Sequence, residues 1–234
     1  MAHRVDLFLL SLTQVQTPIS PELLALLSPD ERQHATTLSS PHRARQWLLS
    51  RALLRRELGH RLPDQVLHFG ATEQGKPRLL DGEYHFNLSH SGDWLVLALC
   101  QSAPVGVDLE LGGRTRDLLK LARRFFAADE SRWLEALPSE ALADGFYRLW
   151  ARKEALLKAH GGGLAAGLEK IIFHPAQHWR LENRLDQHPY EVSDTPFEKG
   201  WLAVATPNAH QLVWHWLDER LEICPEPPHL GINP

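Results

Sequence analysis

Apolar positions in the first half of the chain recur first with the period of a helix and then with that of a strand. The apolar run within residues 1–14 predicts a first strand, and Ser-Pro or Pro signals precede two short predicted helices, 20–27 and 29–38. Residues 42–58, "HRARQWLLSRALLRREL", predict a longer helix that ends at Gly59. Strands are then predicted by "QVLHFG", "EYHFNLS" and "WLVLALC".

The second half runs in the same order, from a strand through helices to several strands. "APVGVDLEL" predicts the strand, and helices are expected at about 115–126, 128–136 and 139–160. Shorter strands are predicted by "LEKIIFHP", "HWRLEN", "PYEVSD", "GWLAVAT" and "QLVWHWL". The pattern therefore predicts an α+β protein of two lobes.

The predicted division of the chain has three parts. Residues 1–103 form an N-terminal α+β lobe, residues 104–220 a C-terminal α+β lobe, and residues 221–234 a Pro-rich extension. No internal sequence repeat is seen, so a twofold relation between the lobes is inferred from the order of elements alone.

The predicted helix 139–160 carries a carboxylate where an apolar residue would be expected. Phe146, Trp150 and Leu157 mark one apolar stripe, and Glu154 lies on or beside it. Lys158 lies one turn further along the same side. The simplest interpretation is an exposed ion pair between Glu154 and Lys158, and the alternative is a site in which Glu154 has a chemical role.

Two more carboxylates occur on the strand "GVDLE". Asp108 and Glu110 are two residues apart, so both side chains leave the same face of the strand. A half-exposed strand explains this pair without any function. Together with Glu154, however, three carboxylates in one site would repel one another unless a hard cation such as Mg²⁺ lay among them, which indicates chemistry at a phosphate.

Two turns carry groups that suit a phosphate. Ser89 and His90 lie at a predicted hairpin tip, "FNLSHSGDW", where hydroxyls and backbone N–H groups gather. In "EQGKPRL", Pro77 biases the backbone of Lys76 towards an extended conformation and so restricts the direction in which the Lys76 side chain leaves the turn. Each turn is also explained by ordinary capping or by a surface position.

Composition and charge narrow the class of protein. The chain has 234 residues, 43% of them hydrophobic, and a net charge of −4, which argues against a nucleic-acid binder. Cys100 and Cys224 lie far apart, which favours a reducing compartment. Asp6 precedes the first apolar run and no cleavage site follows it, and no run reaches the roughly 18 apolar residues of a membrane span. We expect a cytoplasmic protein.

The order of these motifs resembles a known family. "GKP", "FNLSHS", "GVDLE", "RRFFAADE" and "WARKEALLKAHGGGL" follow one another between about residues 73 and 164. This pattern is similar to that of the 4′-phosphopantetheinyl transferases of the large, surfactin-synthetase-activating type. Residues 1–60 and the strands after residue 165 fit by length and element order more than by motif.

The resemblance implies a monomer of two similar lobes related by a pseudo-twofold axis, with coenzyme A in the cleft between them. It implies transfer of 4′-phosphopantetheine from coenzyme A to a serine of an apo carrier protein in fatty acid, polyketide or nonribosomal peptide synthesis, with release of adenosine 3′,5′-bisphosphate. No nucleic acid or membrane partner is implied.

Residue roles also follow from the resemblance. Asp108, Glu110 and Glu154 would hold Mg²⁺, with Mn²⁺ as the alternative ion. Glu154 would take the serine proton, Lys158 would neutralise or protonate the departing phosphate, and Trp150 would floor the cleft. The residues expected to bind coenzyme A are Gly75, Lys76, Pro77, Ser89, His90, Lys158 and Arg45.

One part of the pattern departs from the family. The resemblance implies basic residues for the 3′-phosphate in the segment that here reads "PDERQHATTL", but Glu31 and His34 stand there. Arg43 or Arg45 is therefore expected to take over this role. The basic helix 42–58, or apolar residues near 115–137, would dock the acidic carrier protein.

Two other interpretations use the same residues. A Mg²⁺-dependent phosphoesterase would use the carboxylates on a nucleotide and would need no carrier protein. A non-catalytic carrier-binding module would have no use for Glu154 and Lys158, which are both present.

Overall fold

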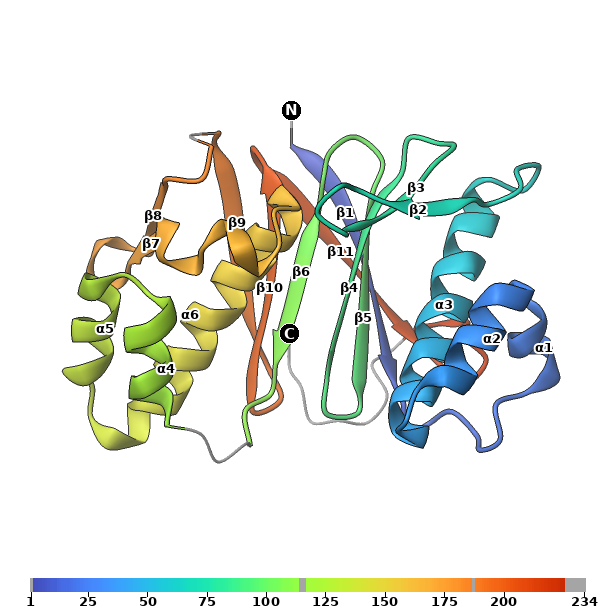
Figure 1. The fold of residues 1–234 in the computed structure, drawn as a ribbon, viewed down its shortest axis with the longest axis horizontal. Coiled ribbons are helices and arrows are strands. Elements are labelled where there is room, and N and C mark those ends of the chain that lie inside the picture. Colours follow the sequence, from blue (N-terminus) through green and yellow to red (C-terminus); the bar gives the residue numbers. More distant parts are fainter. Residues whose placement is uncertain (1, 114–116, 187, 226–234) are drawn as a thin grey trace.

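The computed structural model describes residues 2–113, 117–186 and 188–225. Helices α1–α3 lie on one side of the molecule, helices α4–α6 lie on the other, and most of the strands run between them (Figure 1). The helices are α1 Pro21–Ala25, α2 Pro29–Thr37, α3 Pro41–Arg61, α4 Leu118–Phe125, α5 Ala128–Glu135 and α6 Ser139–His160. The strands are β1 His3–Ser11, β2 Phe69–Ala71, β3 Pro77–Leu79, β4 His85–Ser91, β5 Trp94–Cys100, β6 Gly106–Glu110, β7 Ile171–His174, β8 Arg180–Asn183, β9 Tyr190–Phe197, β10 Gly200–Pro207, β11 His210–Leu217 and β12 Ile223–Cys224.

The mixed α+β class is confirmed, with some changes in the predicted elements. The helix predicted to end at Gly59 continues through it to Arg61 as α3. The sequence analysis missed the short strand β3, Pro77–Leu79. Most of the expected extension, residues 226–234, and two positions of the predicted helix 115–126 lie outside the described residues.

Two sheets carry most of the strands. The larger has the order β12-β11-β1-β5-β4 and the smaller the order β6-β10-β9. The order β1-β5-β4 in the first half of the chain therefore matches β6-β10-β9 in the second, with antiparallel pairing in both. This match supports the expected twofold relation, which stays a prediction together with the lobe boundaries.

Strand β11 joins the two ends of the chain. It pairs in parallel with β1, from His3 opposite His210 to Leu10 opposite Leu217. A strand from residues 208–220, expected in the second lobe, therefore lies in the sheet of the first half. The lobe boundaries themselves stay predictions.

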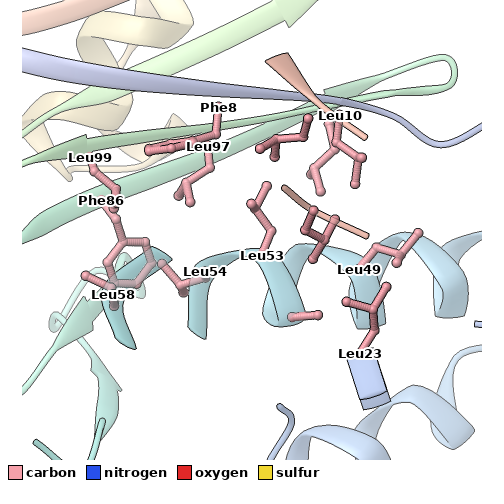
Figure 2. Packing of buried hydrophobic residues seen from close by; sticks show 14 of the residues in the cluster. Phe8, Leu10, Leu23, Leu49, Leu53, Leu54, Leu58, Phe86, Leu97 and Leu99 are labelled. Atoms are coloured by element: carbon pink, nitrogen blue, oxygen red, sulfur yellow. The ribbon is translucent and has the colours of Figure 1, made fainter. Parts of the chain in front are cut away.

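Three apolar cores hold these layers together. The first lies between α3 and the larger sheet, where Leu49, Leu53 and Leu58 of α3 face Phe8 and Leu97 (Figure 2). The second lies between α6 and the smaller sheet. The third forms between the two sheets, from alternate residues on the opposite strand faces: Val5, Leu7, Leu9, Val96, Val107, Leu109, Leu202 and Val204.

Local sequence explains where the helices begin and end. Ser28 and Glu31 form a capping box at the start of α2, and Pro29 occupies the first turn, where a missing N–H costs nothing. Helix α6 ends at Gly161, whose φ of 85° lies in the left-handed region that favours glycine. Among the described residues, no helix is both long enough and apolar enough to cross a membrane.

Candidate active site at the junction of the two sheets

Side chains of β4 join the two sheets at their edges. Asn87, Ser89 and Ser91 lie at alternate positions of β4, and each accepts a hydrogen bond from a backbone N–H on or just after β6. The bonds run from Val107 to Asn87 Oδ1 at 2.9 Å, from Leu109 to Ser89 Oγ at 3.1 Å and from Leu111 to Ser91 Oγ at 3.1 Å. These side chains satisfy N–H groups that a neighbouring strand would otherwise bind.

Gly106 brings β6 into backbone contact with α6. A Cβ atom at this position would overlap the carbonyl oxygen of Ala155 and the backbone nitrogen of Ala159. The absence of a side chain therefore lets the strand that carries Asp108 lie directly against the helix that carries Glu154 and Lys158.

Asp108 and Lys158 form the centre of the site. Lys158 Nζ lies 2.6 Å from Asp108 Oδ1, and it also donates to Ser89 Oγ at 3.3 Å and to the carbonyl oxygen of Val107 at 3.1 Å. Asp108 is 5% exposed, whereas Lys158 is partly exposed, so only the carboxylate side of this ion pair is shielded from water. The sequence predicted a role for each residue but not this direct contact between them.

Glu154 is a carboxylate that resists ionisation. Burial, followed by the negative charge of Asp108, raises the pKa of Glu154 to about 7, while Lys158 acts to lower it. A carboxylate with a pKa near neutrality can accept a proton and release it again at physiological pH, as a general base must. The exposed ion pair considered for Glu154 and Lys158 from the sequence does not describe this half-buried position.

The oxygen atoms of Asp108 differ in their surroundings. Oδ1 binds Lys158 and Ser89, whereas Oδ2 is buried and has no hydrogen-bond partner. A buried carboxylate oxygen without a partner is costly, and a cation is one way to satisfy it. Asp108 is also close enough to raise the pKa of Glu154. The two side chains therefore offer carboxylate oxygens, the ligands that Mg²⁺ prefers.

Glu110 lies two residues further along β6. It pairs across to Trp201 as Asp108 does to Ala203, and both partners contribute to the core beside α6, so Asp108 and Glu110 share that face of the strand. Among the described residues, no three His, Cys, Asp or Glu side chains lie together in an arrangement that could hold a metal ion.

A pocket of about 250 Å³ opens beside these residues. It is lined by Gly75, Lys76 and Pro77 together with Glu154 and Lys158. The structure therefore brings the predicted "GKP" turn to the predicted catalytic helix, although the two segments are about eighty residues apart in the sequence.

Lys76 is itself held in place. Its Nζ donates to the carbonyl oxygens of Val105 at 3.1 Å and Ala159 at 3.2 Å, and burial lowers its pKa to about 8. Ala159 belongs to the last turn of α6, where carbonyl oxygens lack helical partners. Lys76 thus links the turn to the end of α6 and to the segment before β6.

A second pocket, of about 780 Å³, adjoins the first and is basic. Arg43, Arg51, His42 and His90 line it, and the described residues that form its lining include no carboxylate. Pro77 and Asn87 line both pockets. The basic pocket therefore continues the space beside Glu154 towards α3.

Two predicted residues lie elsewhere. Arg45 donates to the backbone carbonyls of Leu12, Val15 and Gln16, so its guanidinium holds that segment and does not line either pocket. Trp150 does not line the pocket beside Glu154, and it packs against Phe125, Phe126 and Phe146 instead.

A buried ion pair lies behind the site and was not predicted from the sequence. Lys153 Nζ lies 2.6 Å from Glu130 Oε2, and both side chains are fully buried. Lys153 also donates to the carbonyl oxygens of Leu168 and Ile171, and Glu130 accepts from the backbone N–H of Phe173. The only trace of this pair in the sequence is a charged residue within each of the segments "FFAADE" and "ARKEA". Neither segment alone distinguishes a buried charge from an exposed one.

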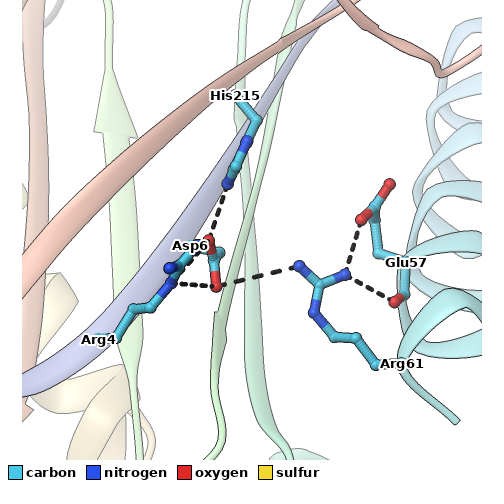
Figure 3. A network of polar contacts seen from close by, with 5 residues as sticks. All are labelled: Arg4, Asp6, Glu57, Arg61 and His215. Carbon is cyan, nitrogen blue, oxygen red and sulfur yellow. Dashed lines mark hydrogen bonds and ion pairs between the residues drawn. The ribbon is translucent and has the colours of Figure 1, made fainter.

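Another polar cluster lies away from these pockets, on β1, α3 and β11. Figure 3 shows Asp6 between Arg4 and His215, with Arg61 bonded to Glu57 and directed at Asp6. Burial acts to raise the pKa of Asp6, but the hydrogen bonds from Arg4 and His215 lower it. The charges satisfy one another, so the cluster ties three elements together.

Known proteins are similar in sequence to this chain over most of its length. Residues 104–207 match the model of the 4′-phosphopantetheinyl transferase superfamily. The chain is 34% identical to slr0495 of Synechocystis over 206 residues, which cover 80% of this chain and 82% of that protein. It is 37% identical to the 4′-phosphopantetheinyl transferase HetI of Nostoc over 73% of this chain and 74% of HetI. It is 33% identical to the 4′-phosphopantetheinyl transferase Sfp of Bacillus subtilis over 66% of this chain and 70% of Sfp.

Proposed function

The chain belongs to the 4′-phosphopantetheinyl transferase superfamily and is an enzyme of that kind, and from this premise we propose that it moves 4′-phosphopantetheine from coenzyme A to a serine hydroxyl of an apo carrier protein. The observation that carries the proposal is the convergence of Asp108, Glu154 and Lys158 beside the pocket lined by Gly75, Lys76 and Pro77. This arrangement places a proposed base, Glu154, a cation, Lys158, and a second carboxylate, Asp108, beside a pocket that adjoins the basic pocket.

Magnesium is the ion we propose for this site. Asp108 Oδ2 and Glu154 would hold it, with Glu110 as the third carboxylate on the same face of β6. When bound, Mg²⁺ supplies positive charge that offsets the negative charge gathering on the pyrophosphate as its bond breaks. Mn²⁺ prefers similar oxygen ligands and is the natural substitute.

Glu154 and Lys158 have different roles in the proposed reaction. Glu154 accepts the proton of the carrier serine as its oxygen attacks the phosphorus attached to pantetheine. The bond between that phosphorus and the bridging oxygen breaks, and adenosine 3′,5′-bisphosphate leaves. Lys158 Nζ donates to the departing phosphate oxygen. Phosphoryl transfer depends mainly on such positioning and charge.

The basic pocket suits the nucleotide end of coenzyme A. We propose that His90 and Arg43 contact the 3′-phosphate and that Arg51, which also lines this pocket, adds positive charge. Gly75, Lys76 and Pro77 line the smaller pocket beside Glu154, and Pro77 also lines the basic pocket. The acidic carrier protein would dock on basic α3 or on α4, Leu118–Phe125.

Mass measurement of a carrier protein tests this function directly. The enzyme is incubated with coenzyme A, Mg²⁺ and apo carriers from fatty acid, polyketide and peptide synthesis. At least one carrier is expected to gain the mass of one phosphopantetheine, and a chelator is expected to prevent the gain.

The control is coenzyme A incubated with enzyme and Mg²⁺ but no carrier. Unchanged coenzyme A is expected in this mixture. Release of the bisphosphate without any carrier, and no carrier gaining mass, would identify a phosphoesterase and overturn the proposal. The monomeric state, the cytoplasmic location and the absence of nucleic-acid or membrane partners stay predictions.

A further inference from the structure

Ser89 occupies the point where the two sheets and α6 meet. Its side chain is buried, with 7% of the residue exposed. Its hydroxyl accepts from the backbone N–H of Leu109 at 3.1 Å and from Lys158 Nζ at 3.3 Å, and it donates to Asp108 Oδ1 at 3.1 Å. A serine hydroxyl has one donor and two acceptor positions, so all three are in use.

Ser89 and His90 both line the basic pocket, but they differ in how far their polar atoms are already bonded within the protein. His90 is exposed and lines the basic pocket, so its ring is accessible to a phosphate. Ser89 could donate to a phosphate only by releasing Asp108, because its single hydrogen already points to Oδ1.

The hydroxyl also decides which oxygen of Asp108 is left for a ligand. Ser89 and Lys158 both bind Oδ1, from β4 and α6 respectively, and so fix the rotation of the carboxylate. The other oxygen, Oδ2, is buried and unpartnered. A carboxylate held by one oxygen and presented by the other is prepared for a cation.

We propose that Ser89 is a positioning residue that orients the Asp108 carboxylate for the divalent ion. The inference rests on the proposed function only for the identity of that ion. Outer-shell partners of metal ligands typically change metal affinity or activity by about 10- to 100-fold when removed.

The test compares Ser89→Ala with the wild-type enzyme by two measurements. The first is Mn²⁺ affinity in the presence of coenzyme A, from the electron paramagnetic resonance signal of free Mn²⁺. The second is the kinetics of carrier modification. Ser89→Ala is expected to lose Mn²⁺ affinity by about 10- to 100-fold and to lower kcat, with the KM for coenzyme A within a factor of about two of wild type.

Two further variants isolate the hydroxyl. Ser89→Thr keeps it and is expected to retain Mn²⁺ affinity. Ser91→Ala removes the same type of bond to β6, the one to Leu111, without touching Asp108. It is expected to lower the melting temperature but to leave Mn²⁺ affinity intact. If Ser89→Ala does not fold, Ser89→Cys, which has only a weak donor, takes its place.

Three outcomes overturn the inference. A raised KM for coenzyme A with unchanged Mn²⁺ affinity would make Ser89 a phosphate ligand. Equal loss of Mn²⁺ affinity in Ser91→Ala would show that Ser89 has only a structural role. A wild-type enzyme that binds no Mn²⁺ would show that there is no ion for Asp108 to hold. Because Mn²⁺ binding is measured without a carrier, failure of the transfer reaction would not decide the role of Ser89.

Discussion

Lys158 Nζ of α6 lies 2.6 Å from Asp108 Oδ1 of β6, so the cation and the carboxylate that we propose to act on one ligand bind each other directly. All three donors of the ammonium group are used, by Asp108, Ser89 and the carbonyl of Val107. To act as proposed, Lys158 would exchange one of these contacts within the protein for a contact with the departing phosphate.

The first prediction concerns Lys158. Lys158→Ala is expected to lower kcat by about 100-fold or more, in the range found for lost general acids, because the leaving phosphate oxygen keeps its charge. The KM for coenzyme A should change by less than about threefold. Steady-state kinetics of carrier modification check this, and a wild-type kcat would remove the proposed role.

The second prediction concerns the carboxylates. Asp108→Asn and Glu154→Gln keep the side-chain shape but remove the charge, and each is expected to abolish transfer. Because burial and Asp108 disfavour ionised Glu154, the metal-free Glu154→Gln variant should melt at the same or a higher temperature than wild type at pH 8. Carrier mass and thermal unfolding are the measurements. Transfer at the wild-type rate by either variant contradicts the assignment.

The third prediction concerns the buried pair behind the site. Lys153→Met leaves the Glu130 carboxylate fully buried without its cation and is expected to lower the free energy of unfolding by about 3–5 kcal/mol. The double variant Glu130→Gln/Lys153→Met should recover more than half of this loss. Urea unfolding followed by tryptophan fluorescence provides the free energies. Additive losses would show that the two residues act independently.

The fourth prediction concerns the contact between β6 and α6. Gly106→Ala is expected to destabilise the protein by about 3 kcal/mol or more, because the methyl group would meet backbone atoms that cannot move separately. Gly59→Ala is the matched control. Gly59 lies inside α3 with open space around it, so alanine there should stabilise by about 0.5–1 kcal/mol. Equal effects at both sites would contradict the close approach.

The fifth prediction concerns pH and Lys76. Burial lowers the pKa of Lys76 to about 8 in the folded protein, from an ordinary value of 10.5. Below about pH 8 both states hold the proton, and between about 8 and 10.5 the unfolded state holds more. The contribution of Lys76 to the free energy of unfolding should therefore rise with pH in this window. Urea unfolding at several pH values checks it. In Lys76→Met the rise should be smaller, and identical profiles would refute the shift.

Periodicity along the chain was enough to predict β4, β5, β6 and α6, and hence the elements that carry Asp108 and Glu154. The pairing of β11 with β1 could not be predicted, because the sequence of a strand does not identify a pairing partner that lies far along the chain. Arg45 was expected at a phosphate, but a long side chain can reach several acceptors, and it binds the carbonyls of residues 12–16.

Burial of polar groups was the main information absent from the sequence. Ser89 resembled a turn residue, yet its three partners come from β6 and α6. Lys153 and Glu130 carried no signal in the sequence that marked them as partners, yet both side chains are fully buried. In each case the partner lies far along the chain, and neither spacing nor composition identifies it.

The parallel pairing of β11 with β1 has a consequence for biosynthesis. The ribosome makes His3–Ser11 well before His210–Leu217, the strand that covers one side of it. Until that second strand is made, the nascent chain carries an apolar strand with one row of open N–H and C=O groups, a template for pairing with other chains. Truncated products that stop before residue 210 would keep this edge permanently exposed and are expected to aggregate.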